Sequence, residues 1–150
     1  MRIDENTLKA PITFRAHESY INDIKFSPDG QPIFSAGMDN VIKLWPVPDW
    51  ACKGMLSGNE KSVNAQNLAS DGTRLITASS DKTIRVWEME TRSERRQLDV
   101  NGNHALLSPD DRCLAVVINP QVNLVCAGNR IRETSTLVLR RLFIFVNDGI

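Results

Sequence analysis

The stretch DNVIKLW, Asp39 to Trp45, returns 42 residues later as DKTIRVW, Asp81 to Trp87. Each copy opens on an aspartate, continues through apolar residues and closes on a tryptophan. The same shift aligns residues 17–46 with 59–88 without a gap and gives 8 identities in 30 positions. A single register that superposes both tryptophans and both Asp-Gly pairs indicates an internal repeat of 42 residues.

Within the first copy, short apolar segments alternate with turn signals. The segments cover residues 21–26, 33–36 and 41–45, and the turns between them are SPDG, 27–30, and GMDN, 37–40. Proline at the second position and glycine at the fourth suit a type I β-turn. The second copy repeats the pattern at residues 63–68, 75–78 and 83–87. Short segments without helical periodicity predict an all-β fold of antiparallel sheets.

These motifs resemble WD40 repeats, the units that form the blades of β-propellers. Repeat one carries Ala16-His17, the FSPDG turn at residues 26–30 and the stretch from Asp39 to Trp45. Both repeats depart from the family pattern after the tryptophan, where Pro46 and Glu88 replace an aspartate. The resemblance implies WD40-type blades, about three of them, in an incomplete propeller. The expected organisation is an N-terminal segment 1–11, repeats at 12–47, 54–90 and 98–126, the last degenerate, and a divergent β-prone segment 127–150.

The third repeat keeps only part of the pattern. SPDD at residues 108–111 resembles the turn, and 113–118 is its second strand, but the spacing from repeat two is 39 residues. Pro120 takes the aspartate position, and Cys126 or a neighbour takes the tryptophan position. At the other end of the chain, Ile12 to Phe14 resembles the outer strand of a preceding blade.

Propellers close with about four to eight blades, so three blades leave two apolar faces open. The chain is then a fragment of a longer protein, which we prefer, or it forms a ring with copies of itself or with another chain. The uncharged stretch Leu142 to Val146 is β-prone and forms either a paired, buried strand or an aggregation-prone edge. We therefore expect that the isolated chain is not a stable monomer and that it self-associates through its open faces, aggregates, or unfolds with low cooperativity.

Composition excludes several classes of protein. The 18 basic and 18 acidic residues balance, which argues against direct nucleic-acid binding. The odd set Cys52, Cys113 and Cys126 is too scattered for a disulfide framework and fits a reducing, intracellular setting, cytoplasmic or nuclear. The N-terminus is not a signal peptide, and the longest apolar stretch, Leu137 to Val146, is too short and too charged to cross a membrane.

The resemblance also implies a hydrogen-bonded chain of polar side chains inside each blade. Asn59 replaces histidine in repeat two and makes that chain incomplete, so Asp81 should matter less to stability than Asp39. A catalytic role for His17 and Asp39 is rejected, because the repeat accounts for both. The implied blade residues are His17, Ser35, Asp39, Trp45, Thr77, Asp81 and Trp87.

The resemblance implies a non-enzymatic interaction scaffold that binds peptides or proteins on its rim loops. Tyr20 and Met38 are candidate partner contacts because they are apolar at loop positions, and Trp50, in a proline-rich connection, is a third. Packing within the blade is the alternative for each. His104 is expected to be a loop-edge side chain, and no catalytic, metal or cofactor motif occurs. Alternative functions are a regulatory or sensor segment of a larger signalling ATPase or kinase, or a chromatin-associated WD-repeat protein.

Overall fold

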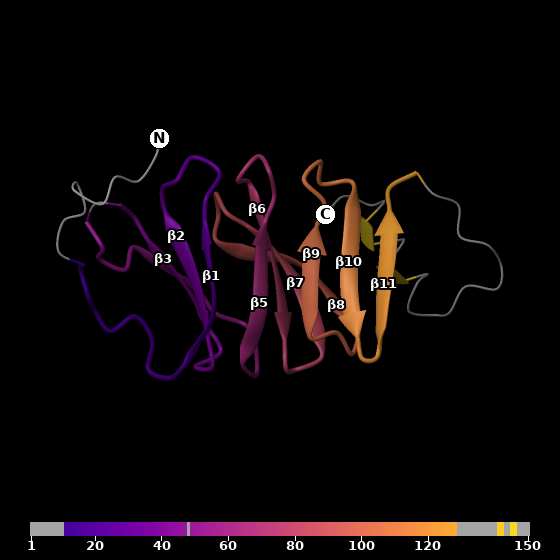
Figure 1. Ribbon diagram of the computed structural model, residues 1–150, viewed down its shortest axis with the longest axis horizontal. Coiled ribbons are helices and arrows are strands. Elements are labelled where there is room, and N and C mark those ends of the chain that lie inside the picture. Colours follow the sequence, from indigo (N-terminus) through magenta and orange to yellow (C-terminus); the bar gives the residue numbers. More distant parts are fainter. Residues whose placement is uncertain (1–10, 48, 129–140, 143–144, 147–150) are drawn as a thin grey trace.

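The computed structural model describes residues 11–47, 49–128, 141–142 and 145–146. Eleven strands form three antiparallel sheets that follow one another across the molecule (Figure 1). Blade one is β1 Ile21–Phe26, β2 Ile33–Gly37, β3 Ile42–Trp45 and β4 Gly54–Leu56. Blade two is β5 Val63–Leu68, β6 Arg74–Ser79, β7 Thr83–Glu88 and β8 Ser93–Asp99. Blade three is β9 His104–Leu107, β10 Cys113–Ile118 and β11 Gln121–Cys126.

The all-β prediction of about three propeller blades is confirmed. The described strands form an open arc with blade one and blade three at its ends (Figure 1). Blades one and two have four strands in sequence order, and the described part of blade three has three. The outer strand β4 of blade one lies between the two aligned segments, 17–46 and 59–88. Blades one and two therefore each take the fourth strand from the residues that follow their own aligned segment.

The Ser-Pro-Asp-Gly turn builds the tight connection between the first two strands of blade one. The Gly30 amide donates to the Ser27 carbonyl at 2.8 Å, and the Asp29 carboxylate accepts from the Gln31 amide at 2.9 Å. Gly30 has φ of 76° and Gly72, its counterpart, 72°, a left-handed conformation that glycine adopts without strain. In blade three Asp111 takes this position with φ of 56°.

Each blade buries apolar side chains against the next one. One cluster joins Phe34, Ala36, Ile42, Leu44 and Leu56 of blade one to Val63, Leu75 and Trp87 of blade two. A second cluster joins Ile76, Ala78, Ile84 and Val86 of blade two to Ala105, Leu114, Val116 and Val125 of blade three. Alternation along the strands therefore gives every blade two apolar faces, a leading face toward the previous blade and a trailing face toward the next.

Blade three differs from the other two in the β10–β11 hairpin. Val125 pairs with Leu114 as Trp87 pairs with Leu75, so a neighbour of Cys126 occupies the tryptophan position. Cys113 and Cys126 are cross-strand partners and form a disulfide with an S–S distance of 2.07 Å. The sequence did not indicate this bond, because two cysteines 13 residues apart become neighbours only through the hairpin register.

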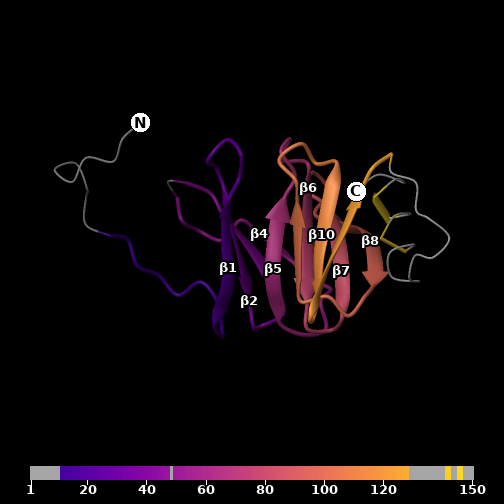
Figure 2. The same ribbon diagram turned by 45° about the vertical axis from the view of Figure 1, so that its right-hand side comes forward.

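Residues 141–142 and 145–146 have helical backbone conformation, so these four residues do not form the strand considered for Leu142 to Val146, whereas residues 143–144 lie outside the described residues. Leu142, Phe145 and Val146 are buried against the cluster between blades two and three, close to β8 (Figure 2). Their spacing of three and four residues is the spacing of side chains on one side of a helix, and all three side chains are buried.

Residues 11–17 form no strand, although Ile12 to Phe14 resembles an outer strand. They lie on the leading face of blade one, where the ring of Phe14 is 4.9 Å from that of Trp45. The segment therefore takes the place of an outer strand but does not form strand hydrogen bonds in the described structure.

Candidate interaction surfaces

The rim of blade one carries two exposed apolar side chains. Tyr20 precedes β1 and is 78% exposed, and Met38, in the β2–β3 turn, is 48% exposed. The Met38 amide donates to the Tyr20 carbonyl at 2.8 Å, so the two loops are tied together. Side chains of this kind provide apolar contact area at a protein surface.

A chain of buried hydrogen bonds supports these loops from below. Trp45 Nε1 donates to Ser35 Oγ at 2.8 Å, and Ser35 Oγ lies 2.6 Å from His17 Nε2. His17 Nδ1 lies 2.8 Å from Asp39 Oδ1, and Asp39 Oδ2 accepts from the Glu18 amide at 3.0 Å. The chain thereby joins the loop before β1 to the β2–β3 turn.

In this series of hydrogen bonds each residue donates to the next, from Trp45 through Ser35 and His17 to Asp39. With the proton on Nδ1, His17 donates to Asp39 and its Nε2 accepts a hydrogen bond from the Ser35 hydroxyl, which itself accepts from Trp45. Burial alone would raise the pKa of the Asp39 carboxyl. The hydrogen bonds from His17 and the Glu18 amide outweigh burial and lower that pKa below its usual range.

Ser35, His17 and Asp39 are the residue types of a hydrolase catalytic triad, but a substrate cannot reach the Ser35 hydroxyl. Ser35 is 1% exposed and its hydroxyl is held between an indole and an imidazole. A nucleophile needs a substrate atom within reach, and this hydroxyl faces only the interior of the blade. These hydrogen bonds connect the loop before β1 to the β2–β3 turn.

Blade two meets the same need with different groups. Trp87 Nε1 donates to Thr77 Oγ1 at 3.0 Å, as in blade one, but Asn59 makes no hydrogen bond to Thr77. Instead, the buried Arg85 donates to Asp81 Oδ2 at 2.6 Å and to Asn59 Oδ1 at 3.0 Å. A further donor, Arg85 Nε, reaches Glu94 at 3.0 Å.

Asp81 collects more donors than its counterpart Asp39. Besides Arg85, it accepts from the Glu60 amide and from the amide and hydroxyl of Thr83. Burial alone would raise the pKa of Asp81, and the hydrogen bonds from Thr83, the Glu60 amide and Arg85 lower it. Arg85 was not among the residues expected from the sequence, where it reads as a conservative replacement of Lys43.

Blade two does not repeat the apolar side chains of the blade-one rim. Ser62 and Ser80 occupy in blade two the places of Tyr20 and Met38, and they keep the same backbone hydrogen bond, at 2.9 Å. The backbone of the rim is therefore repeated between the two blades, while its side chains are not.

Trp50 lies away from this rim. It is half-buried, with its ring 6.2 Å from that of Phe14, and its amide donates to the Pro46 carbonyl at 3.0 Å. Together with Trp45 and other residues of the leading face it lines a cavity of about 280 Å³. Trp50 therefore packs on its own blade and does not join Tyr20 and Met38.

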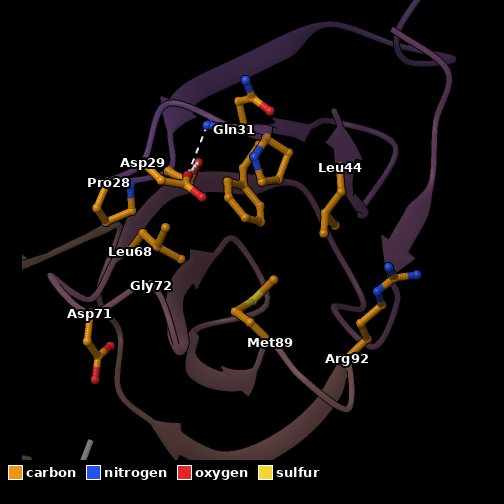
Figure 3. Close-up of a pocket in the computed structure, with 12 residues that line it drawn as sticks. Pro28, Asp29, Gln31, Leu44, Leu68, Asp71, Gly72, Met89 and Arg92 are labelled. Carbon is orange, nitrogen blue, oxygen red and sulfur yellow. Dashed lines mark hydrogen bonds between the residues drawn. The ribbon is translucent and has the colours of Figure 1, made fainter. Parts of the chain in front are cut away.

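A groove of about 400 Å³ between blades one and two was not indicated by the sequence (Figure 3). It lies at the end of the strands opposite the rim, and its residues come from positions between 27 and 92. Asp29 and Asp71 lie on one side and Arg92 on the other, with apolar side chains such as Met89 between them (Figure 3). The Ser27 hydroxyl lowers the pKa of Asp29, and the Thr73 amide lowers that of Asp71. Such a groove presents apolar surface between opposite charges.

Other candidate chemistry is limited within the described part of the chain. His104 is exposed at the start of β9, and Cys52 is an exposed free thiol. Residues 11–47, 49–128, 141–142 and 145–146 contain no cluster of histidine, cysteine, aspartate and glutamate suited to a metal ion. They also contain no helix long and apolar enough to span a membrane.

Comparison with known families gives two matches to the family model described as "WD domain, G-beta repeat", at residues 9–46 and 50–88. The two ranges cover just over half of the chain. A solved structure, the WD40 repeats of RRP9, superposes with a TM-score of 0.63 and 22% identity, covering 68% of this chain and 33% of that chain. At that identity the likeness concerns the fold.

Several curated proteins share part of the sequence. WD repeat-containing protein 36 of Homo sapiens is 44% identical over 46 residues, 31% of this chain and 5% of that protein. Pre-mRNA-processing factor 19 of Mus musculus is 28% identical over 65 residues, 43% of this chain and 13% of that protein. The CCR4-associated factor 4 homolog of Candida glabrata is 38% identical over 53 residues, 35% of this chain and 9% of that protein. The chain thus matches only a small share of each relative's length.

Proposed function

The chain belongs to the WD40 repeat family, and on that premise we propose that it is a non-enzymatic interaction scaffold whose rim on blade one binds peptides or other proteins. The observation that supports this is the pair Tyr20 and Met38, exposed on two loops that hydrogen bonds hold together. A preorganised rim loses little conformational entropy when a partner binds. Blade two, with serines at both positions, provides the same backbone without the apolar contacts.

A random peptide library displayed on phage and selected on the 150-residue chain tests the proposal. Selected peptides should bind at least about tenfold more weakly to Tyr20→Ala and to Met38→Ala, because truncating a central apolar contact commonly costs more than 1 kcal/mol. Met55→Ala is the matched control, since Met55 is an exposed methionine on the outer strand β4. A selection that enriches no peptide, or peptides that bind all three variants equally, would contradict the proposed rim.

We also propose an intracellular location. The name of the relative Pre-mRNA-processing factor 19 supports it, as does the odd number of cysteines. The Cys113–Cys126 disulfide weighs against it, because cytosolic and nuclear thiols are kept reduced. Alkylation of cells with a thiol reagent before lysis decides the point: an intracellular chain should carry the label on both cysteines, and a chain protected at both would refute the location.

A further inference from the structure

The leading face of blade one is exposed, although blade two buries the equivalent face. Ile24 is 57% exposed, and its counterpart in blade two, Gln66, is 1% exposed. Ile21 and Phe26 are exposed in the same way. In blade two these positions are covered by the trailing face of blade one, with Leu44 and Ile42 at its centre. The molecule therefore shows in its own interior which kind of surface fits the open face.

The other end of the arc presents that kind of surface. The pairing of β10 with β11 places Val122 and Leu124 at the positions that Ile42 and Leu44 hold in blade one. Val122 is 68% exposed, whereas Ile42 is 0% exposed. Blade three thus ends in an apolar trailing face with no blade to receive it among the described residues, and blade one begins in the matching leading face.

The two ends also complement each other in their strands. Blade three has three strands in its described part, and β11 is its edge. Residues 12–14 are related by the 42-residue repeat to β4, which is the fourth strand of blade one. They already lie on the leading face of blade one, with Phe14 against Trp45, as Leu56 of β4 shares a cluster with Trp87. An extended segment that has no strand partner lies at one end, and β11 is the edge strand among the described residues at the other.

We propose that two copies of this chain associate head to tail into a closed ring of six blades, each copy donating residues 12–14 as a fourth strand to β11 of the other. The pairing of β3 with β4 fixes the register. By that pairing Phe14 lies opposite Val122 of the second copy, Thr13 opposite Asn123, and Ile12 opposite Leu124. Six blades fall within the range of closed propellers, and a head-to-tail contact that closes avoids open-ended fibres.

Head-to-tail pairing can be tested by measuring the molecular mass of two single variants and of their mixture. Light scattering of the wild-type chain at micromolar concentration should give twice its mass of 16.8 kDa. Ile24→Asp and Leu124→Asp should each give monomers, because each buries an unpaired carboxylate in both contacts of the ring and weakens association more than about a hundredfold. The mixture of the two variants should restore a dimer, since one chain keeps an intact leading face and the other an intact trailing face.

Met55→Asp is the matched control and should remain a dimer. Its counterpart in blade two, Gln97, stays exposed although the leading face of that blade is covered. A wild-type monomer at all concentrations would overturn the proposal. So would a dimer that Ile24→Asp abolishes and Leu124→Asp leaves intact, because that result identifies a head-to-head contact. A mixture that stays monomeric would also refute it, provided that both variants keep the β-sheet circular dichroism of the wild type.

Cross-linking tests the strand register without destabilising either face. In a Cys52→Ala background, a Thr13→Cys chain mixed with an Asn123→Cys chain should form a disulfide-linked pair on a non-reducing gel. Thr91→Cys, at an exposed position in the loop after β7, is the control partner and should not cross-link to Asn123→Cys. Equal yields from both mixtures would show that residues 12–14 do not add to β11.

Discussion

In blade one the aspartate of the β2–β3 turn is held by a histidine, and in blade two the equivalent aspartate is held by an arginine. His17 reaches Asp39 from the loop before β1, whereas Arg85 reaches Asp81 from β7, within the blade. Both arrangements end at the same place, with the aspartate accepting the amide of the loop before the first strand. The repeated requirement is a negative charge that ties two rim loops, and its partner can come from different elements.

The space around each aspartate differs accordingly. A Cβ added to Gly37 would lie 2.4 Å from both Asp39 Oδ1 and His17 Nδ1, so the imidazole leaves no room for a side chain. In blade two Asn59 is shorter than histidine, and Ser79 occupies the position of Gly37, its hydroxyl accepting from the Asp81 amide at 3.2 Å. Blade one therefore combines His17 with Gly37, and blade two combines the shorter Asn59 with the larger Ser79.

The largest effect is expected for Asp81→Ala. The change leaves the guanidinium of Arg85, 4% exposed, with only Glu94 as a charged partner. Removing one member of a buried ion pair costs about 3–5 kcal/mol in the free energy of unfolding. Urea unfolding measures the loss, and Arg85→Met in the same chain should recover part of it. A loss below about 1 kcal/mol would mean that Arg85 is solvated in solution.

Asp39→Ala should have a smaller effect, about 1–3 kcal/mol for the buried donor His17 that loses its acceptor. The substitution leaves no buried permanent charge without a partner. The nearby cation, Lys43, keeps its hydrogen bond to the Ala16 carbonyl. The sequence alone predicts the reverse order, since it shows Asn59 in place of histidine but not the arginine that compensates. Urea unfolding of both variants in one buffer ranks them, and a larger loss for Asp39→Ala would restore the sequence-based order.

Gly37→Ala separates the effect of space from that of charge. The added methyl group must displace His17 or Asp39, and overpacking of this kind costs about 1–3 kcal/mol. The rim should also loosen, which amide hydrogen exchange at Glu18 and Met38 would detect. Ser79→Gly in blade two is the control for the equivalent position, where no such displacement arises. Equal exchange in wild type and Gly37→Ala would show that the chain does not hold the rim.

The repeated part of the fold could be predicted from the sequence because each strand and turn occurs twice in one register. Asp39 and Trp45 lie where the family pattern implies, since short-range turn chemistry and alternation set both. Arg85 was missed because a cation on a strand looks the same in sequence whether it faces water or Asp81. Its burial depends on Glu94, which comes from the neighbouring strand β8.

The C-terminal third was less predictable because it lacks this repetition. A β-hairpin that is one residue shorter than that of blade two moves Val125 into the tryptophan position and brings Cys113 and Cys126 together. For Leu142 to Val146, β-propensity favoured a strand, but tertiary packing decides such cases. Leu142, Phe145 and Val146 are buried in the apolar cluster between blades two and three.

The smallest expected effect concerns acid, and both blades should show it. The pKa of Asp39 is lowered in the folded chain, mainly through His17 and the Glu18 amide acting against burial, so the folded state binds this proton less readily than the unfolded state does. The stabilisation is therefore complete above the unfolded pKa of about 4 and disappears as pH falls through the lower folded value.

Asp39→Asn removes that titration, so its deficit in unfolding free energy relative to wild type should be constant from about pH 7 to 5 and shrink below about pH 4. Asp81→Asn should follow the same course, because the pKa of Asp81 is lowered as well. Urea midpoints measured at several pH values give the two curves. A deficit that grows as the pH falls would mean that the folded carboxyl takes up protons more readily than the unfolded one, which the hydrogen bonds from His17 and Arg85 exclude.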